Sequence, residues 1–104
     1  MCKNVDDVFN KIKKLINDDS IKILVDNQFY FTKKSVDFVN NLDKRYFLNS
    51  YYDLNTLDIL LMIESAKNLE EVKKQLNEDY ESDYSNSLYQ NFTSALESGA
   101  NLCI

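Results

Sequence analysis

The chain of 104 residues contains no histidine, no proline and no tryptophan, and only one glycine and two cysteines. Without an imidazole it lacks Ser-His and Cys-His nucleophile pairs, histidine metal ligands and the usual general base near neutral pH. Two cysteines at opposite ends of the chain do not have the spacing of a zinc site. These absences predict a protein that is not an enzyme and that holds no cofactor and no metal.

The scarcity of glycine and proline also restricts the fold. Long β-meanders and glycine-rich phosphate loops need those residues, whereas helices can be joined by asparagine, aspartate and serine turns. Thirteen asparagines are available for caps and turns, and 44% of the residues are hydrophobic. The sequence therefore predicts a single domain over residues 1–104, mainly α, with a core of its own.

Cys2 and Cys103 can form a disulfide only if the two ends of the chain meet, and their number implies no disulfide framework. No apolar run follows a basic region at the N-terminus, and no run approaches about 18 residues, so we expect neither a signal peptide nor a membrane span. The cytoplasm, with both thiols free, is the expected location.

Apolar residues at helical spacing predict five helices, over residues 5–17, 32–42, 56–67, 69–76 and 86–98. Asn4, Asn55 and Asn68 are the expected N-caps, Glu71 completes a capping-box pattern with Asn68, and Gly99 is the expected C-cap. The residues expected in the core are Val8, Phe9, Ile12, Ile16, Leu57, Leu60, Leu61, Leu69, Val72, Leu76, Leu88, Phe92 and Leu96, with Val36, Val39 and Leu42 inward on the second helix.

The stretch "SIKILVDNQFYFT" has a different pattern. Two β-branched and aromatic runs flank Asp26 and Asn27, which favours a short β-hairpin near residues 21–31. A continuous helix there, giving an all-α bundle, is the alternative. A lone hairpin is marginal in water, and residues 45–52 are a candidate for a third strand.

The charge is distributed unevenly along the chain. All 12 Lys and Arg residues lie in the first 74 positions, balanced by 12 acids, so the net charge of −5 comes from residues 75–104. Residues 77–86, "NEDYESDYSN", which we call the acidic segment, hold four of the last five acids together with two tyrosines. We predict that this segment contacts a basic surface on a protein partner through Glu78, Asp79, Tyr80, Glu81, Asp83 and Tyr84.

The simplest interpretation of the acidic segment is a solvated turn between helices. Asp79, Glu81 and Asp83 also resemble the start of a calcium loop, but Tyr84 and Gln90 stand where that loop needs glycine and a bidentate glutamate. The acidity argues against direct binding of nucleic acid.

Three interpretations of the function remain. A small acidic protein without catalytic motifs suits an inhibitor that neutralises a nuclease toxin or a CRISPR-type effector, as immunity and phage anti-defence proteins do. Alternatively, "IKILVDNQFYFTKKSV" followed by "NTLDILLMIESAKNLEEVKKQL" resembles a BTB or Skp1-type domain over residues 5–76, which implies an adaptor that binds a cullin-type scaffold. Thr32 departs from the histidine that many such domains carry. Self-association through exposed aromatic residues is a third interpretation.

Overall fold

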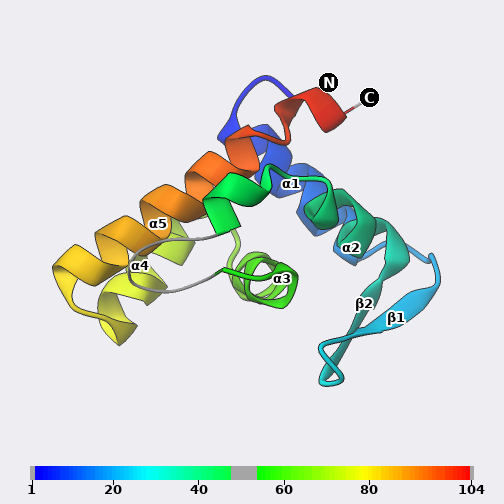
Figure 1. Cartoon of the computed structure of the whole chain (residues 1–104), viewed down its shortest axis with the longest axis horizontal. Helices are drawn as coiled ribbons and strands as arrows, with labels where there is room; N and C mark the ends of the chain where they lie inside the picture. The colour runs from blue at the N-terminus through cyan, green and yellow to red at the C-terminus, as the bar shows by residue number, and fades with distance from the viewer. Residues whose placement is uncertain (1, 48–53, 104) are drawn as a thin grey trace.

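The structure, a computed structural model, describes residues 2–47 and 54–103. It is mainly helical with one two-stranded antiparallel sheet, as predicted. Figure 1 shows the arrangement, with α4 and α5 side by side at one end and the hairpin projecting at the other. The elements in chain order are α1 (Val5–Ile16), β1 (Lys22–Val25), β2 (Phe29–Thr32), α2 (Lys33–Asn40), the 3-10 helix η1 (Lys44–Phe47), α3 (Thr56–Ser65), α4 (Leu69–Asp79), α5 (Ser82–Glu97) and the 3-10 helix η2 (Ala100–Leu102).

Side-chain caps start four of the helices. The three predicted asparagine caps are confirmed, because Asn4, Asn55 and Asn68 each accept a hydrogen bond from the backbone N–H three residues on, at 2.8–3.0 Å. Thr32 caps α2 in the same way. The reciprocal capping box forms at Asn55, whose N–H donates to the Asp58 carboxylate at 3.1 Å, and not at Asn68, where it was predicted and where only the Asn68 side chain accepts from the Glu71 N–H. Local sequence therefore decides where these helices begin.

The hairpin is confirmed, and the all-α alternative is wrong. Asp26 and Asn27 both have positive φ (51° and 56°), the left-handed conformation that aspartate and asparagine tolerate best after glycine. The Gln28 N–H donates to the Val25 carbonyl, and the ladder then pairs Val25 with Phe29. The suggested third strand is wrong for residues 45–47, which belong to η1, and its remaining residues lie outside the described part of the chain.

The last helix begins and ends for reasons that the sequence did not reveal. α5 starts at Ser82, four residues before the predicted Asn86, although Glu81 at its N-cap makes no side-chain capping bond. Gly99 is not a left-handed C-cap, because its φ is −84°. It is needed for space instead: a Cβ at this position would lie 2.6 Å from Leu42 Cδ2 and 3.3 Å from Val8 Cγ1.

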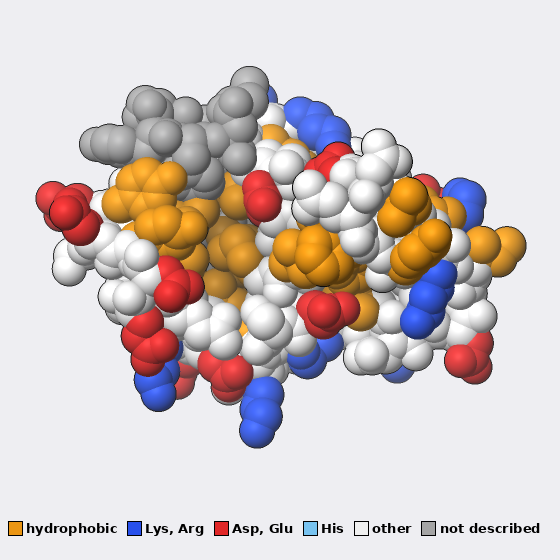
Figure 2. Space-filling model, turned by 90° about the horizontal axis from the view of Figure 1, so that it is seen from below, with side chains coloured by type: hydrophobic (Ala, Val, Ile, Leu, Met, Phe, Trp, Pro, Cys, Tyr) orange, Lys and Arg blue, Asp and Glu red, His pale blue; other side chains and the backbone are white. Residues whose placement is uncertain are grey.

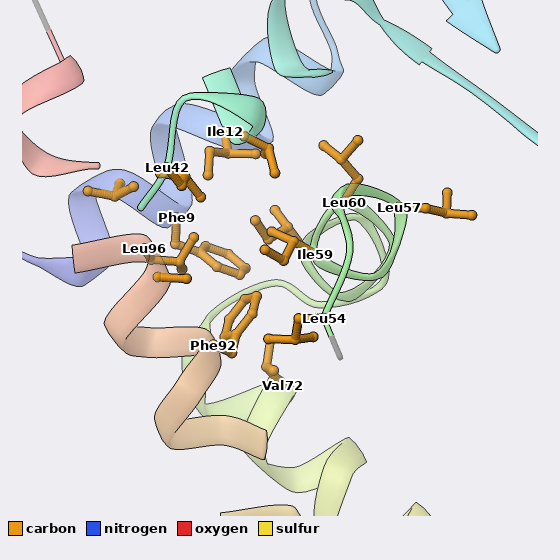
Figure 3. Packing of buried hydrophobic residues seen from close by; sticks show 14 of the residues in the cluster. Phe9, Ile12, Leu42, Leu54, Leu57, Ile59, Leu60, Val72, Phe92 and Leu96 are labelled. Atoms are coloured by element: carbon orange, nitrogen blue, oxygen red, sulfur yellow. The ribbon is translucent and has the colours of Figure 1, made fainter. Parts of the chain in front are cut away.

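The buried side chains form one cluster, to which the five α-helices, both strands and η1 contribute. In Figure 3, the rings of Phe9 and Phe92 lie beside each other at its centre, and Ile59 of α3 points toward them. Eleven of the thirteen predicted core residues are buried, as are the three expected on α2. Ile16 and Leu61 are only half-buried, and the α3 positions buried instead are Ile59 and Ile63.

The last carbonyl groups of a helix lack intrahelical partners, so those of α3 need a donor. Lys13 of α1 supplies it. Its Nζ donates to the carbonyl of Ala66 at 2.5 Å and to that of Ile63 at 3.1 Å. A cation at a helix C-terminus also interacts favourably with the helix dipole. This ammonium group ties the first helix to the point where the chain leaves α3 for α4.

Cys2 and Cys103 are joined by a disulfide, with Cα atoms 5.4 Å apart. The expectation of free thiols is therefore wrong for this structure. The ends meet because η2 packs against α1, and Figure 1 shows both termini at the same edge of the molecule. The bond links positions 101 residues apart and closes almost the whole chain into a ring.

Replacing Lys13 by Met keeps most of the side-chain length and removes the donor. We expect this variant to lose about 1–3 kcal/mol of unfolding free energy, because the part-buried Ala66 carbonyl loses the hydrogen bond from the Lys13 ammonium and the Ile63 carbonyl keeps only the Ala66 N–H. Urea denaturation measures the change. The matched control is Lys14→Met on the exposed side of the same helix, which should stay within about 0.5 kcal/mol of the unaltered protein. Equal losses in both variants would contradict the role given to Lys13.

The disulfide should stabilise the fold by restricting the unfolded chain. We expect the variant with serine at both Cys2 and Cys103 to lose about 2–4 kcal/mol of unfolding free energy. Urea unfolding of the oxidised and reduced protein gives an independent measurement, and a reducing agent should not affect the serine variant. A reduced protein as stable as the oxidised one would show that the bond adds nothing.

Candidate functional site: a groove beside the acidic segment

The acidic segment forms the end of α4, the junction and the first turn of α5. Of the six residues predicted to bind a partner, Tyr84 is half-buried and the other five are exposed: Glu78, Asp79, Tyr80, Glu81 and Asp83. None of the four carboxylates forms an ion pair with a described residue. The segment thus presents uncompensated negative charge.

The junction has a defined local structure. Ser85, which is buried, has its Oγ 2.7 Å from Asn77 Oδ1 and 3.1 Å from the Ser82 carbonyl oxygen, which ties the start of α5 to α4. The rings of Tyr80 and Tyr84 pack with their centroids 5.1 Å apart and their planes tilted by 42°. Tyr80 remains 47% exposed. The segment is therefore an ordered turn with an aromatic pair on its surface.

The same aromatic pair lies at one side of a groove with a volume of about 440 Å³ between α3, α4 and the start of α5. Figure 2 shows the face seen from below, where apolar side chains line a hollow and acidic side chains lie at its edges. The residues that line the groove are Leu54, Asp58, Leu61, Met62, Ser65, Val72, Gln75, Leu76, Asp79, Tyr80, Tyr84 and Leu88.

Three of the six predicted residues line this groove, namely Asp79, Tyr80 and Tyr84. Glu78 lines a separate shallow hollow on the other side of α4. Sequence reasoning did not identify the wall that α3 contributes, which includes Asp58 and Met62. The signal in the sequence is the composition of α3, which has more apolar residues than one core-facing stripe needs and therefore indicates a second contact face.

Electrostatically, the groove is one-sided. Among the described residues, its lining contains two carboxylates, Asp58 and Asp79, and no lysine or arginine. Away from the groove, hydrogen bonds from Arg45 hold the pKa of Asp43 below its ordinary value, and burial raises the pKa of Tyr89.

The carboxylates of the acidic segment do not converge. Within residues 2–47 and 54–103, no group of three histidine, cysteine, aspartate or glutamate side chains is placed to hold a metal ion. Within the same residues, no helix is long and apolar enough to cross a membrane. What the arrangement offers is a binding surface, with an apolar floor, two tyrosines and a negative rim.

No protein-family model, curated protein or solved structure matches the chain. The resemblance of residues 5–76 to BTB and Skp1-type domains stays a prediction, and the functional argument has to be made from the groove and its charge.

Proposed function

We propose that the protein is a small non-enzymatic inhibitor that binds a nucleic-acid-acting protein, of the nuclease-toxin or CRISPR-effector kind, through its acidic segment. The observation that carries this proposal is the set of four exposed carboxylates without an ion-pair partner among the described residues, next to an exposed tyrosine. A protein that binds nucleic acid has a basic surface, so its charge complements that of the segment.

The tyrosines give the surface more than charge. Tyrosine contributes a large contact area and a hydroxyl group, and it is enriched among the residues that dominate binding energy in protein interfaces. Complementary charge would mostly raise the association rate and select against acidic partners. An inhibitor of this kind blocks the basic surface by occupying it, and it needs no catalytic group.

We place this action in the cytoplasm, where the proposed targets work. Reducing conditions there would keep Cys2 and Cys103 as thiols. Binding does not depend on the disulfide, because the groove and the acidic segment belong to α3, α4 and α5, whereas the bond joins the chain ends beside α1 and η2.

The proposal predicts salt-sensitive capture of a nucleic-acid-acting protein. The immobilised protein is incubated with lysate of the cells in which it is made, at low ionic strength and at about 1 M salt, where charges are screened beyond about 3 Å. Mass spectrometry should identify such a protein at low salt only, and the purified target should lose activity when the small protein is added.

The variant that tests the segment is E78Q/D79N/E81Q/D83N, which should retain the fold and lose the capture. The matched control, D19N/D26N/E64Q/E97Q, removes the same charge from exposed carboxylates elsewhere. Capture that is unchanged by the first variant, or a captured protein that keeps full activity, would reject the proposal.

Self-association is a second candidate, and the hairpin favours it. Four of the exposed large apolar side chains lie there: Ile21, Leu24, Phe29 and Tyr30. An apolar contact between copies should change little with salt, unlike the acidic interface. Sedimentation velocity at both salt concentrations would show a dimer at low and high salt if the hairpin associates. A monomer at all concentrations would exclude this candidate.

A further inference from the structure

We infer that the groove between α3 and α4 holds a cationic amphipathic helix of the partner, with apolar side chains on the groove floor and arginine or lysine side chains at the acidic rim. This inference rests on the proposed function, because it names the kind of segment through which the basic partner is held.

The walls of the groove have helical spacing. On α3 they are formed by a stripe from Asp58 to Ser65, and on α4 by a stripe from Val72 to Asp79. Each stripe spans an interval of seven residues, about 10 Å along a helix axis. A bound helix has the same rise per residue and presents anchors at positions i, i+3 or i+4, and i+7. Two turns of a partner helix therefore match the length of either stripe.

The size of the groove fits anchoring side chains. A volume of about 440 Å³ lies within the range of ordinary ligand pockets, roughly 300–1,000 Å³. The groove accommodates a few apolar side chains of the partner helix, and the helix itself lies across the opening. Met62, a side chain that adapts to different shapes, lies on the floor.

The two ends of the groove differ in chemistry. At the end near the α3–α4 connection, the Gln75 Nε2 donates to the Ser65 carbonyl at 3.3 Å, which leaves a neutral, hydrogen-bonded boundary. Asp58 on α3 and Asp79 on α4 each lie at the end of their stripe that is farther from the α3–α4 connection. The carboxylate of Asp58 is held in place by the Asn55 N–H. Cationic side chains of the occupant therefore belong beside these two carboxylates.

Tyr80 provides a further contact for a cation. Its half-exposed ring lies at the groove edge beside that of Tyr84. The planar guanidinium group of an arginine stacks on aromatic faces, and it also forms paired hydrogen bonds with a carboxylate. Asp79 and Tyr80 are adjacent in the chain, so one arginine can use both.

The hydrogen-bonding needs of the occupant's backbone favour a helix over an extended strand. The groove walls are helices, whose interior backbone groups are already hydrogen-bonded within the helix. A strand lying on this apolar floor would leave its own N–H and C=O groups without partners, which is costly when they are buried. A helix satisfies its backbone internally, so the helix is the favoured occupant.

The test is a selection from a displayed library of peptides about three helical turns long. The library is selected on the unaltered protein and counterselected on Leu61→Lys, which places a cation on the groove floor. If circular dichroism shows that Leu61→Lys does not fold, Met62→Lys is used for the counterselection instead. Enriched peptides should carry apolar residues at helical spacing flanked by arginine or lysine. Enriched peptides without this pattern, or no enrichment over the counterselection, would overturn the inference.

The enriched peptides are then measured by fluorescence anisotropy. Affinity should fall at least tenfold for D58N/D79N, in which asparagine at position 58 preserves the helix cap. It should be unchanged for D19N/E97Q, which removes the same charge from exposed positions outside the groove. Equal affinity for D58N/D79N and D19N/E97Q would contradict the placement of the cations.

Partner capture separates this inference from the proposed function. The variant E78Q/E81Q/D83N changes the acidic segment outside the groove, whereas Leu61→Lys changes the groove alone. If both variants lose capture of the partner, the inhibitor proposal and the helix in the groove are both supported. If only the segment variant loses capture, the inhibitor proposal stands and the helix in the groove is rejected. If neither variant loses capture, both proposals are rejected.

Discussion

The ammonium group of Lys13 at the carboxyl end of α3 is the interaction on which the arrangement of the molecule depends. α3 packs against the core through Leu57, Ile59, Leu60 and Ile63, and the last carbonyl groups of a helix need donors from outside it. Lys13 reaches them from α1 and joins the first helix to the point where the chain leaves α3 for α4. The position of α4 against α3 then determines the groove. One side chain on the first helix thus supports a site built from the other half of the chain.

The groove combines two properties that are usually separated on protein surfaces. Its floor is apolar because α3 has more apolar residues than the core can cover, so Leu61 and Met62 are left partly accessible. Its rim is acidic because the last thirty residues contain no cation. An apolar floor alone would favour non-specific association, and a carboxylate cluster alone would be solvated. Together they select a partner that is both cationic and amphipathic.

Features set by a few neighbouring residues were predictable from the sequence. The caps at Asn4, Asn55 and Asn68 and the turn at Asp26–Asn27 depend on side chains that bond to the backbone within three residues or tolerate left-handed φ. The acidic segment was also visible, because charge can be counted along the chain. These predictions required no knowledge of packing.

Features that join distant residues were not predictable in this way. The sequence predicts a local C-cap at Gly99, but the glycine is required by Leu42 and Val8, which approach it from elements far apart in sequence. An apolar helix such as α3 has no clear period, so its buried face cannot be predicted from spacing and the prediction that Leu61 lies in the core is wrong. The wall that α3 gives to the groove depends on how α3 lies against α4, and the pairing of Cys2 with Cys103 depends on where η2 ends.

That pairing gives the molecule an unusual covalent topology. With the bond closed, almost every residue belongs to one loop of backbone and sulfur, and only the extreme termini lie outside it. A single cut in this loop, for example by a protease at the exposed hairpin turn, would open the ring without producing two fragments. The two parts of the cut chain would stay joined through the disulfide, which lies beside α1 and η2 and away from the proposed binding surface.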